Sequence, residues 1–189
     1  MLLAAGASID DSLLKAILLD DAPAVQGLLK TQDLNRKLRV PSAFTSCDGV
    51  TPLHVCAEFN CVGSAQALIA AGADVNAAAE IDAEGIGGQT PIFHAVNSIF
   101  NCGRPMMELL ADAGADLEVR VQGLVWGPGA PWETLILDVT PISYAQCGLY
   151  AQFHRREQDV FANLDYLYRK RTGRALPVRN VPNKYLAPK

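Results

Sequence analysis

Apolar residues follow a helical spacing in two short runs between positions 51 and 71. The first run opens with Thr51 and Pro52, a pair suited to a helix start. The Thr51 hydroxyl can accept a first-turn amide, and a proline at the first helical position loses no hydrogen bond. The second run ends at Gly72, which tolerates the left-handed conformation common after a helix. The inward-facing positions are Leu53, Cys56, Ala57, Ala65, Leu68 and Ile69. The pattern predicts a first helix, a break near 60–63 and a second helix over about 64–71.

The same arrangement recurs along the chain, which indicates a repeat. Thr-Pro-aliphatic openings start at positions 51, 90 and 140, and residues 90–114 repeat the whole pattern with a longer first helix. Residues 12–35 form a more divergent copy, and the last copy has a long second helix over about 157–170. A helix pair has one apolar side that it cannot bury alone, so the copies must stack on one another. The predicted pairs begin near Ser12, Thr51, Thr90 and Thr140.

Residues 51–77, TPLHVCAEFNCVGSAQALIAAGADVNA, resemble an ankyrin repeat in both the TPLH opening and the GADVNA ending. An ankyrin unit is a turn followed by two antiparallel helices, about 33 residues in all. The resemblance implies an all-α solenoid of stacked helix-turn-helix units joined by β-turn or hairpin fingers. Residues 2–9, LLAAGASI, align with residues 68–75. The chain is therefore expected to begin inside a repeat, which is either an eroded cap or the end of a unit that starts upstream.

The resemblance extends over residues 1–172 and leaves a basic C-terminal tail. Residues 155–189 hold nine Lys and Arg against three Asp and Glu, whereas the rest of the chain is acidic. Cations are favourable near a helix C-terminus, so we expect this end to lie back on the acidic body. The predicted units are a partial repeat at 2–10, repeats at about 11–47, 48–86, 87–137 and 138–172, and the tail at 173–189.

Two connections between the predicted repeats are long for the family, by about 6 residues after Gly72 and about 14 after Gly114. The resemblance therefore implies two enlarged fingers. The second one, residues 119–139, holds both tryptophans around a Gly/Pro turn and is expected to form a long hairpin with an aromatic tip. Trp126 is favoured as an exposed anchor and Trp132 as a cover for apolar surface, although either ring could play either role. A third irregular connection spans residues 36–46.

Ankyrin arrays bind other proteins through a concave surface made by their first helices and fingers, and the resemblance implies the same here. The His54 ring is implied to be structural, held by the Thr51 hydroxyl and tied to the next finger. The side chains expected to contact a partner are Glu58, Phe59, His94, Asn97, Ser98, Trp126, Trp132 and Tyr144.

Composition and motifs argue against an enzyme and against a metal or cofactor site. The net charge is −4, half of the residues are hydrophobic, and no apolar run reaches the roughly 18 residues of a membrane span. Five cysteines, an odd number without a Cys-x-x-Cys pair, indicate reduced thiols in the cytoplasm. Cys56 and Cys61 lack the spacing of a zinc site, and GIGGQT at 85–90 lacks the lysine of a phosphate loop. We therefore expect no enzyme activity, no cofactor and no metal.

The leading interpretation is a monomeric interaction module for an unidentified protein partner, with no membrane role and with nucleic acid disfavoured as a ligand. One alternative is a regulatory or inhibitory ankyrin segment, acting within a larger protein or on a separately encoded enzyme. Another is an enzyme or metal site built from the insertions.

Overall fold

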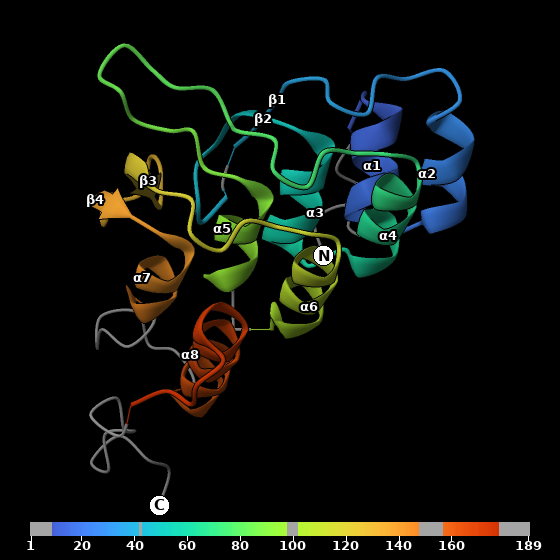
Figure 1. Ribbon diagram of the computed structural model, residues 1–189. Coiled ribbons are helices and arrows are strands. Elements are labelled where there is room, and N and C mark those ends of the chain that lie inside the picture. Colours follow the sequence, from blue (N-terminus) through green and yellow to red (C-terminus); the bar gives the residue numbers. More distant parts are fainter. Residues whose placement is uncertain (1–8, 42, 98–101, 148–156, 178–189) are drawn as a thin grey trace, which may run out of the picture.

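The computed structural model describes residues 9–41, 43–97, 102–147 and 157–177, which form a row of four helix pairs (Figure 1). The two helices of each pair pack together, and the pairs follow one another in chain order across the molecule. The pairs are α1 (Ser12–Leu18) with α2 (Ala22–Leu28), α3 (Pro52–Phe59) with α4 (Val62–Ala70), α5 (Pro91–Val96) with α6 (Arg104–Asp112), and α7 (Pro141–Gln146) with α8 (Glu157–Thr172).

The helices stack as two rows. The first helices contact each other in the order α1, α3, α5, α7, and the second helices in the order α2, α4, α6. Val25 of α2, Leu68 of α4 and Leu110 of α6 have no exposed surface. Each pair therefore covers the apolar side of its neighbours, which is the stacked arrangement that the repeat pattern predicts.

The helix starts and stops are fixed by local sequence. Thr51, Thr90 and Thr140 are the N-caps of α3, α5 and α7, and a proline follows each of them at the start of the helix. These starts confirm the predicted ones. Gly72 and Gly114 follow the second helices with φ of 95° and 93°, a conformation that glycine adopts without steric cost.

Two separate antiparallel hairpins lie in the connections of the described residues. Strands β1 (Leu38–Val40) and β2 (Cys47–Val50) pair in the first connection, and β3 (Val121–Trp126) and β4 (Thr134–Val139) pair in the third. The second connection closes on itself through a bridge between Ile81 and Gly87. The connections gather along one edge of the helical rows (Figure 1).

Backbone hydrogen bonds join the three connections to one another. Gly87 N donates to Gly123 O at 2.9 Å, which ties the second connection to β3. Ser46 N donates to Val125 O at 3.0 Å, and Gly127 N donates to Phe44 O at 2.6 Å. The β3–β4 hairpin is therefore attached to both earlier connections through β3, and its turn end is bonded to the first connection.

Helix α8 closes the C-terminal end of the stack. Val160, Leu164 and Leu167 of α8 are buried. Its last turn is basic, and Lys170 and Arg171 pair with Asp112 and Glu118 at 2.9 Å and 2.6 Å. The described part of the basic end thus lies on acidic residues of the third pair. None of the described helices combines the length and the apolar character needed to cross a membrane.

Candidate functional site

The structure corrects the expected exposure of five of the eight predicted partner-binding side chains. Phe59 and Trp132 are exposed, at 40% and 48%, as a contact surface requires. Ser98 lies outside the described residues. The five buried ones, each no more than 6% exposed, are Glu58, His94, Asn97, Trp126 and Tyr144. Partner contact by any of the eight stays a prediction, but these five do not line an open surface.

The burial has a specific cause, which is a segment of the first connection that lies across the row of first helices. We call residues 43–47 the covering segment. Glu58, near the end of α3, accepts hydrogen bonds at Oε1 from Phe44 N at 2.6 Å and Thr45 N at 3.2 Å. Thr45 Oγ1 lies 2.9 Å from Tyr144 Oη, in α7. Cys47 Sγ lies 3.9 Å from His94 Nδ1, in α5. The covering segment therefore contacts three successive first helices.

Sequence reasoning flagged residues 36–46 as irregular but did not assign Thr45 a role. Thr45 is fully buried, and it is 99 residues away in sequence from its partner Tyr144. No local pattern could reveal this contact, because it depends on the connection folding back over helices that follow much later. Burial also raises the pKa of the Tyr144 phenol, so this hydroxyl stays protonated and can donate to Thr45.

Cys47, the last residue of the covering segment, forms a buried polar cluster with Glu58 and His94. Glu58 Oε2 lies 2.9 Å from His94 Nδ1, and one ligand-type atom from each residue falls within 4.8 Å of the others. All three side chains are at most 4% exposed. The other imidazole nitrogen, His94 Nε2, has no hydrogen-bond partner among the described residues.

The cluster does not have the geometry of an activated cysteine. A base that serves a nucleophile uses one imidazole nitrogen for the thiol and the other for the orienting carboxylate. Here Cys47 and Glu58 both approach the same atom, Nδ1 of His94. Burial, with the charges of Glu58 and Asp48, raises the pKa of the Cys47 thiol, so the reactive thiolate is disfavoured.

His54 has the structural role that the family resemblance implied. Its Nδ1 lies 2.8 Å from Thr51 Oγ1 at the start of α3, and its Nε2 lies 3.0 Å from Gln89 O in the second connection. Burial, together with the neighbouring His94, lowers the pKa of His54, so the ring is neutral at pH 7. The ring therefore joins the helix start to the next connection and is committed to that role.

The two tryptophans take the reverse of their favoured roles. Trp126 ends β3 next to the covering segment, where it forms a bridge with Thr45, and its ring lies 4.5 Å from that of Trp132. Trp132 lies within the turn, and its ring stacks on that of Phe44 with 6.2 Å between the ring centroids. Gly127, with φ of 67°, permits this approach, because a Cβ there would lie 1.8 Å from the Trp132 ring. Trp126 is thus the buried ring at the turn end of β3, and Trp132, within the turn, is the exposed one.

The outer side of the hairpin is apolar and open. Leu135 and Leu137 of β4 are 49% and 63% exposed, whereas Val139 at the end of the same strand is buried. Both leucines lie beside Gly123 of β3, and Ile86 of the second connection reaches the same glycine. We call Ile86, Leu135 and Leu137 the hairpin face. Ile81, 64% exposed, lies in the same second connection as Ile86.

Stacked helix pairs of this kind define a helical repeat protein of the solenoid class. The model of the family of ankyrin repeats, in three copies, matches residues 13–121, which is more than half of the chain. The chain belongs to the ankyrin repeat family, and the resemblance noted in its sequence is confirmed. Ankyrin repeats generally mediate protein–protein interaction. A search of curated proteins found no match.

Proposed function

We propose that this ankyrin repeat protein is a non-catalytic interaction module that binds a partner protein through the hairpin face. The main support for this proposal is that Leu135 and Leu137 are more than 45% exposed on one strand of a regular hairpin. Apolar side chains gathered on a surface are typical of a protein-binding site. The second and third connections act in this proposal as enlarged fingers, and insertions in repeat proteins often form the binding side.

The buried residues support this surface from below. Glu58 holds the covering segment by two backbone amides. The covering segment is in turn bonded to β3 and to Gly127, the first residue of the hairpin turn. Trp132 and Phe59, 48% and 40% exposed, remain further candidates for partner contact. A hairpin anchored in this way loses little conformational entropy when a partner binds, which favours affinity.

The partner we propose is a protein with an apolar contact site. The described cysteines form no disulfide, which fits a reducing compartment, and we propose a cytoplasmic location for a monomeric chain. The regulatory alternative differs only in the nature of the partner, which would then be an enzyme whose activity changes on binding.

The test compares one double variant with one single control, and each replaces exposed leucine by glutamine. Leu135→Gln with Leu137→Gln removes the hairpin face, while Leu19→Gln alters a leucine of similar exposure, 54%, at the C-cap of α1. Both proteins are immobilised, and proteins captured from lysate of the source cells are identified and quantified against wild type. We expect the first variant to lose at least about tenfold of a partner that Leu19→Gln retains, with both melting temperatures close to wild type. Equal capture by both variants would reject the hairpin face as the binding site.

A further inference from the structure

The buried cluster of Cys47, Glu58 and His94 has no part in the proposed binding surface, yet its composition is unusual for a protein interior. Charged groups are rarely buried without a partner that compensates their desolvation. The Glu58–His94 contact accounts for one oxygen and one nitrogen. It does not account for the thiol directed at the same nitrogen.

We propose that Cys47, Glu58 and His94 form a zinc site that ties the first connection to the first helices. The three donors are a thiolate, a carboxylate and an imidazole, which are the ligand types that zinc takes in proteins. Sγ, Oε2 and Nδ1 lie within 4.8 Å of one another, with Nδ1 2.9 Å from Oε2 and 3.9 Å from Sγ. Ligand atoms around a tetrahedral zinc ion stand about 3.3–3.5 Å apart, so metal binding needs movements of about 1 Å.

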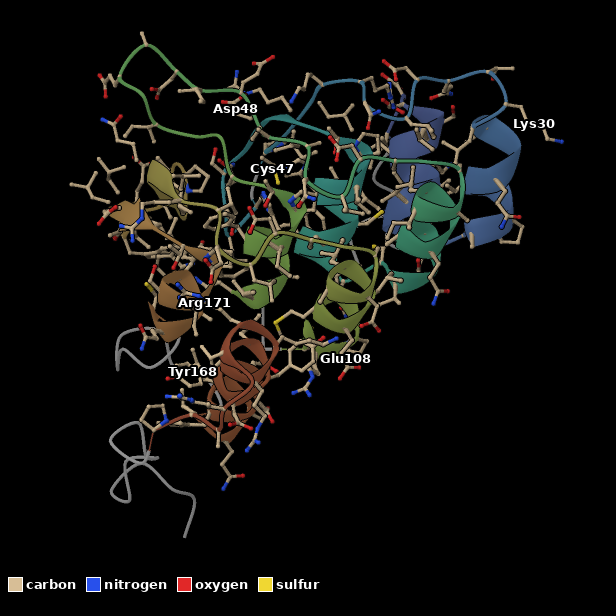
Figure 2. All side chains as sticks on the ribbon, viewed as in Figure 1. Lys30, Cys47, Asp48, Glu108, Tyr168 and Arg171 are labelled. Atoms are coloured by element: carbon tan, nitrogen blue, oxygen red, sulfur yellow. The ribbon has the colours of Figure 1, made fainter. Side chains whose placement is uncertain are left out.

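The surroundings supply what such a site needs. The second oxygen of Glu58 is fixed by the amides of Phe44 and Thr45, a support that orients metal-binding carboxylates. Cys47 lines a cleft of about 380 Å³ beside Arg39, Asp48 and Pro128, so the site lies close to the surface. Figure 2 shows Cys47 on the inner side of the first connection, facing the helices, with Asp48 placed toward the outer edge. No further His, Cys, Asp or Glu of the described residues joins the cluster, so a water molecule would complete the coordination.

The proton balance of binding follows from the protonation state of the thiol. Zinc binds cysteine as the thiolate, so the proton of the Cys47 thiol leaves to the solvent as the Zn–S bond forms. The imidazole binds through Nδ1, and its remaining proton then resides on Nε2. Each zinc ion bound is therefore expected to release at least one proton.

This site could not be found in the sequence because its ligands come from three separate segments. Cys47 lies in the first connection, Glu58 near the end of α3 and His94 in α5, so no pair has the short spacing that marks a zinc motif. The absence of such a motif was the reason to expect no metal, and only the folding of the covering segment brings the three ligands together.

The experiment uses the full chain without an affinity tag, freed of metal by a chelator and then titrated with Zn²⁺ or Co²⁺. Calorimetry in two buffers of different protonation enthalpy gives the stoichiometry and the protons released. Co²⁺ adds a thiolate charge-transfer band in the near ultraviolet, which reports directly on a cysteine ligand. Cys47→Ser and Glu58→Gln remove one ligand each, and Cys61→Ser is the matched control, since Cys61 is also a buried free thiol but stands outside the cluster.

We expect one zinc ion per chain, a higher melting temperature with zinc than with chelator, and a Co²⁺ thiolate band in wild type and in Cys61→Ser. Cys47→Ser is expected to lose the band and at least about tenfold in affinity, and Glu58→Gln to lose affinity to a similar extent. The proposal is overturned by the lack of saturable binding in wild type, by a cobalt spectrum without a thiolate band, or by folded Cys47→Ser that binds as wild type does. If Cys47→Ser fails to fold, the wild-type band and the affinity of Glu58→Gln decide the question. None of these outcomes depends on whether the hairpin face binds a partner.

Discussion

The first and third connections of this ankyrin repeat protein use irregular sequence in opposite ways. The covering segment of the first connection is turned inward, and its backbone amides and the Thr45 hydroxyl are bonded to Glu58 and Tyr144 of the first helices. The β3–β4 hairpin is bonded to the earlier connections through β3 and Gly127, and it leaves Leu135 and Leu137 of β4 in solvent. A long connection can therefore either fill the surface of a repeat array or extend it. The helical positions that a covering segment occupies are closed to a partner, and binding then falls to the connection that remains open.

The largest expected effect separates the two tryptophans of the hairpin. Trp126→Ala removes a ring that is 6% exposed and is expected to lower the free energy of unfolding by about 3–5 kcal/mol. Trp132→Ala removes a ring that is 48% exposed and is expected to cost about 1 kcal/mol. Urea denaturation of both variants measures the difference. Equal losses would mean that Trp126 contributes no more than Trp132 to the free energy of unfolding.

A second variant tests whether the covering segment is held by the buried carboxylate. Glu58→Ala leaves two backbone amides and the His94 ring without their acceptor, so we expect a loss of about 3 kcal/mol in the presence of a chelator. Hydrogen exchange at Phe44 and Thr45 should accelerate together with the loss of stability. Unchanged protection at these two amides would show that the segment is held by other contacts.

The contact between the covering segment and α7 is expected to contribute less. Tyr144→Phe removes the neutral hydrogen bond to Thr45 Oγ1 together with the interaction of the phenol with the Asn97 side chain, at a cost of about 1 kcal/mol. Thr45→Val removes the same bond from the other side. Denaturation of the two single variants and of the double variant forms a cycle, and additive losses would exclude a direct interaction in solution.

The smallest expected effect on stability is at the hairpin face. Leu137→Ser alters a side chain that is 63% exposed, so the free energy of unfolding should change by less than about 0.5 kcal/mol. Thermal and urea denaturation measure this change. A loss above about 1 kcal/mol would mean that Leu137 packs in solution, and that this connection too is turned toward the body of the protein.

The fold was predictable because its determinants are local and repeated. A threonine cap followed by a proline opens α3, α5 and α7, and a glycine follows α4 and α6, so each signal acts on its own few residues. The surface was less predictable because it depends on contacts that skip along the chain. His94 was expected on an open face, and only the covering segment makes that face an interior. The tryptophan roles likewise depend on strand pairing, which places Trp126 opposite Thr45.

The span of the covering segment has a consequence for how the protein folds and unfolds. In a simple solenoid each repeat touches only its neighbours, so stability is a sum of local terms and single repeats can fray in turn. Here Thr45, from the connection after the first helix pair, is bonded to Tyr144 of the fourth pair, and Ser46 is bonded to Val125. These contacts raise the mean sequence separation of native contacts, which slows folding. They also couple the fourth pair to the second, so we expect the described repeats to unfold as one cooperative unit instead of one repeat at a time.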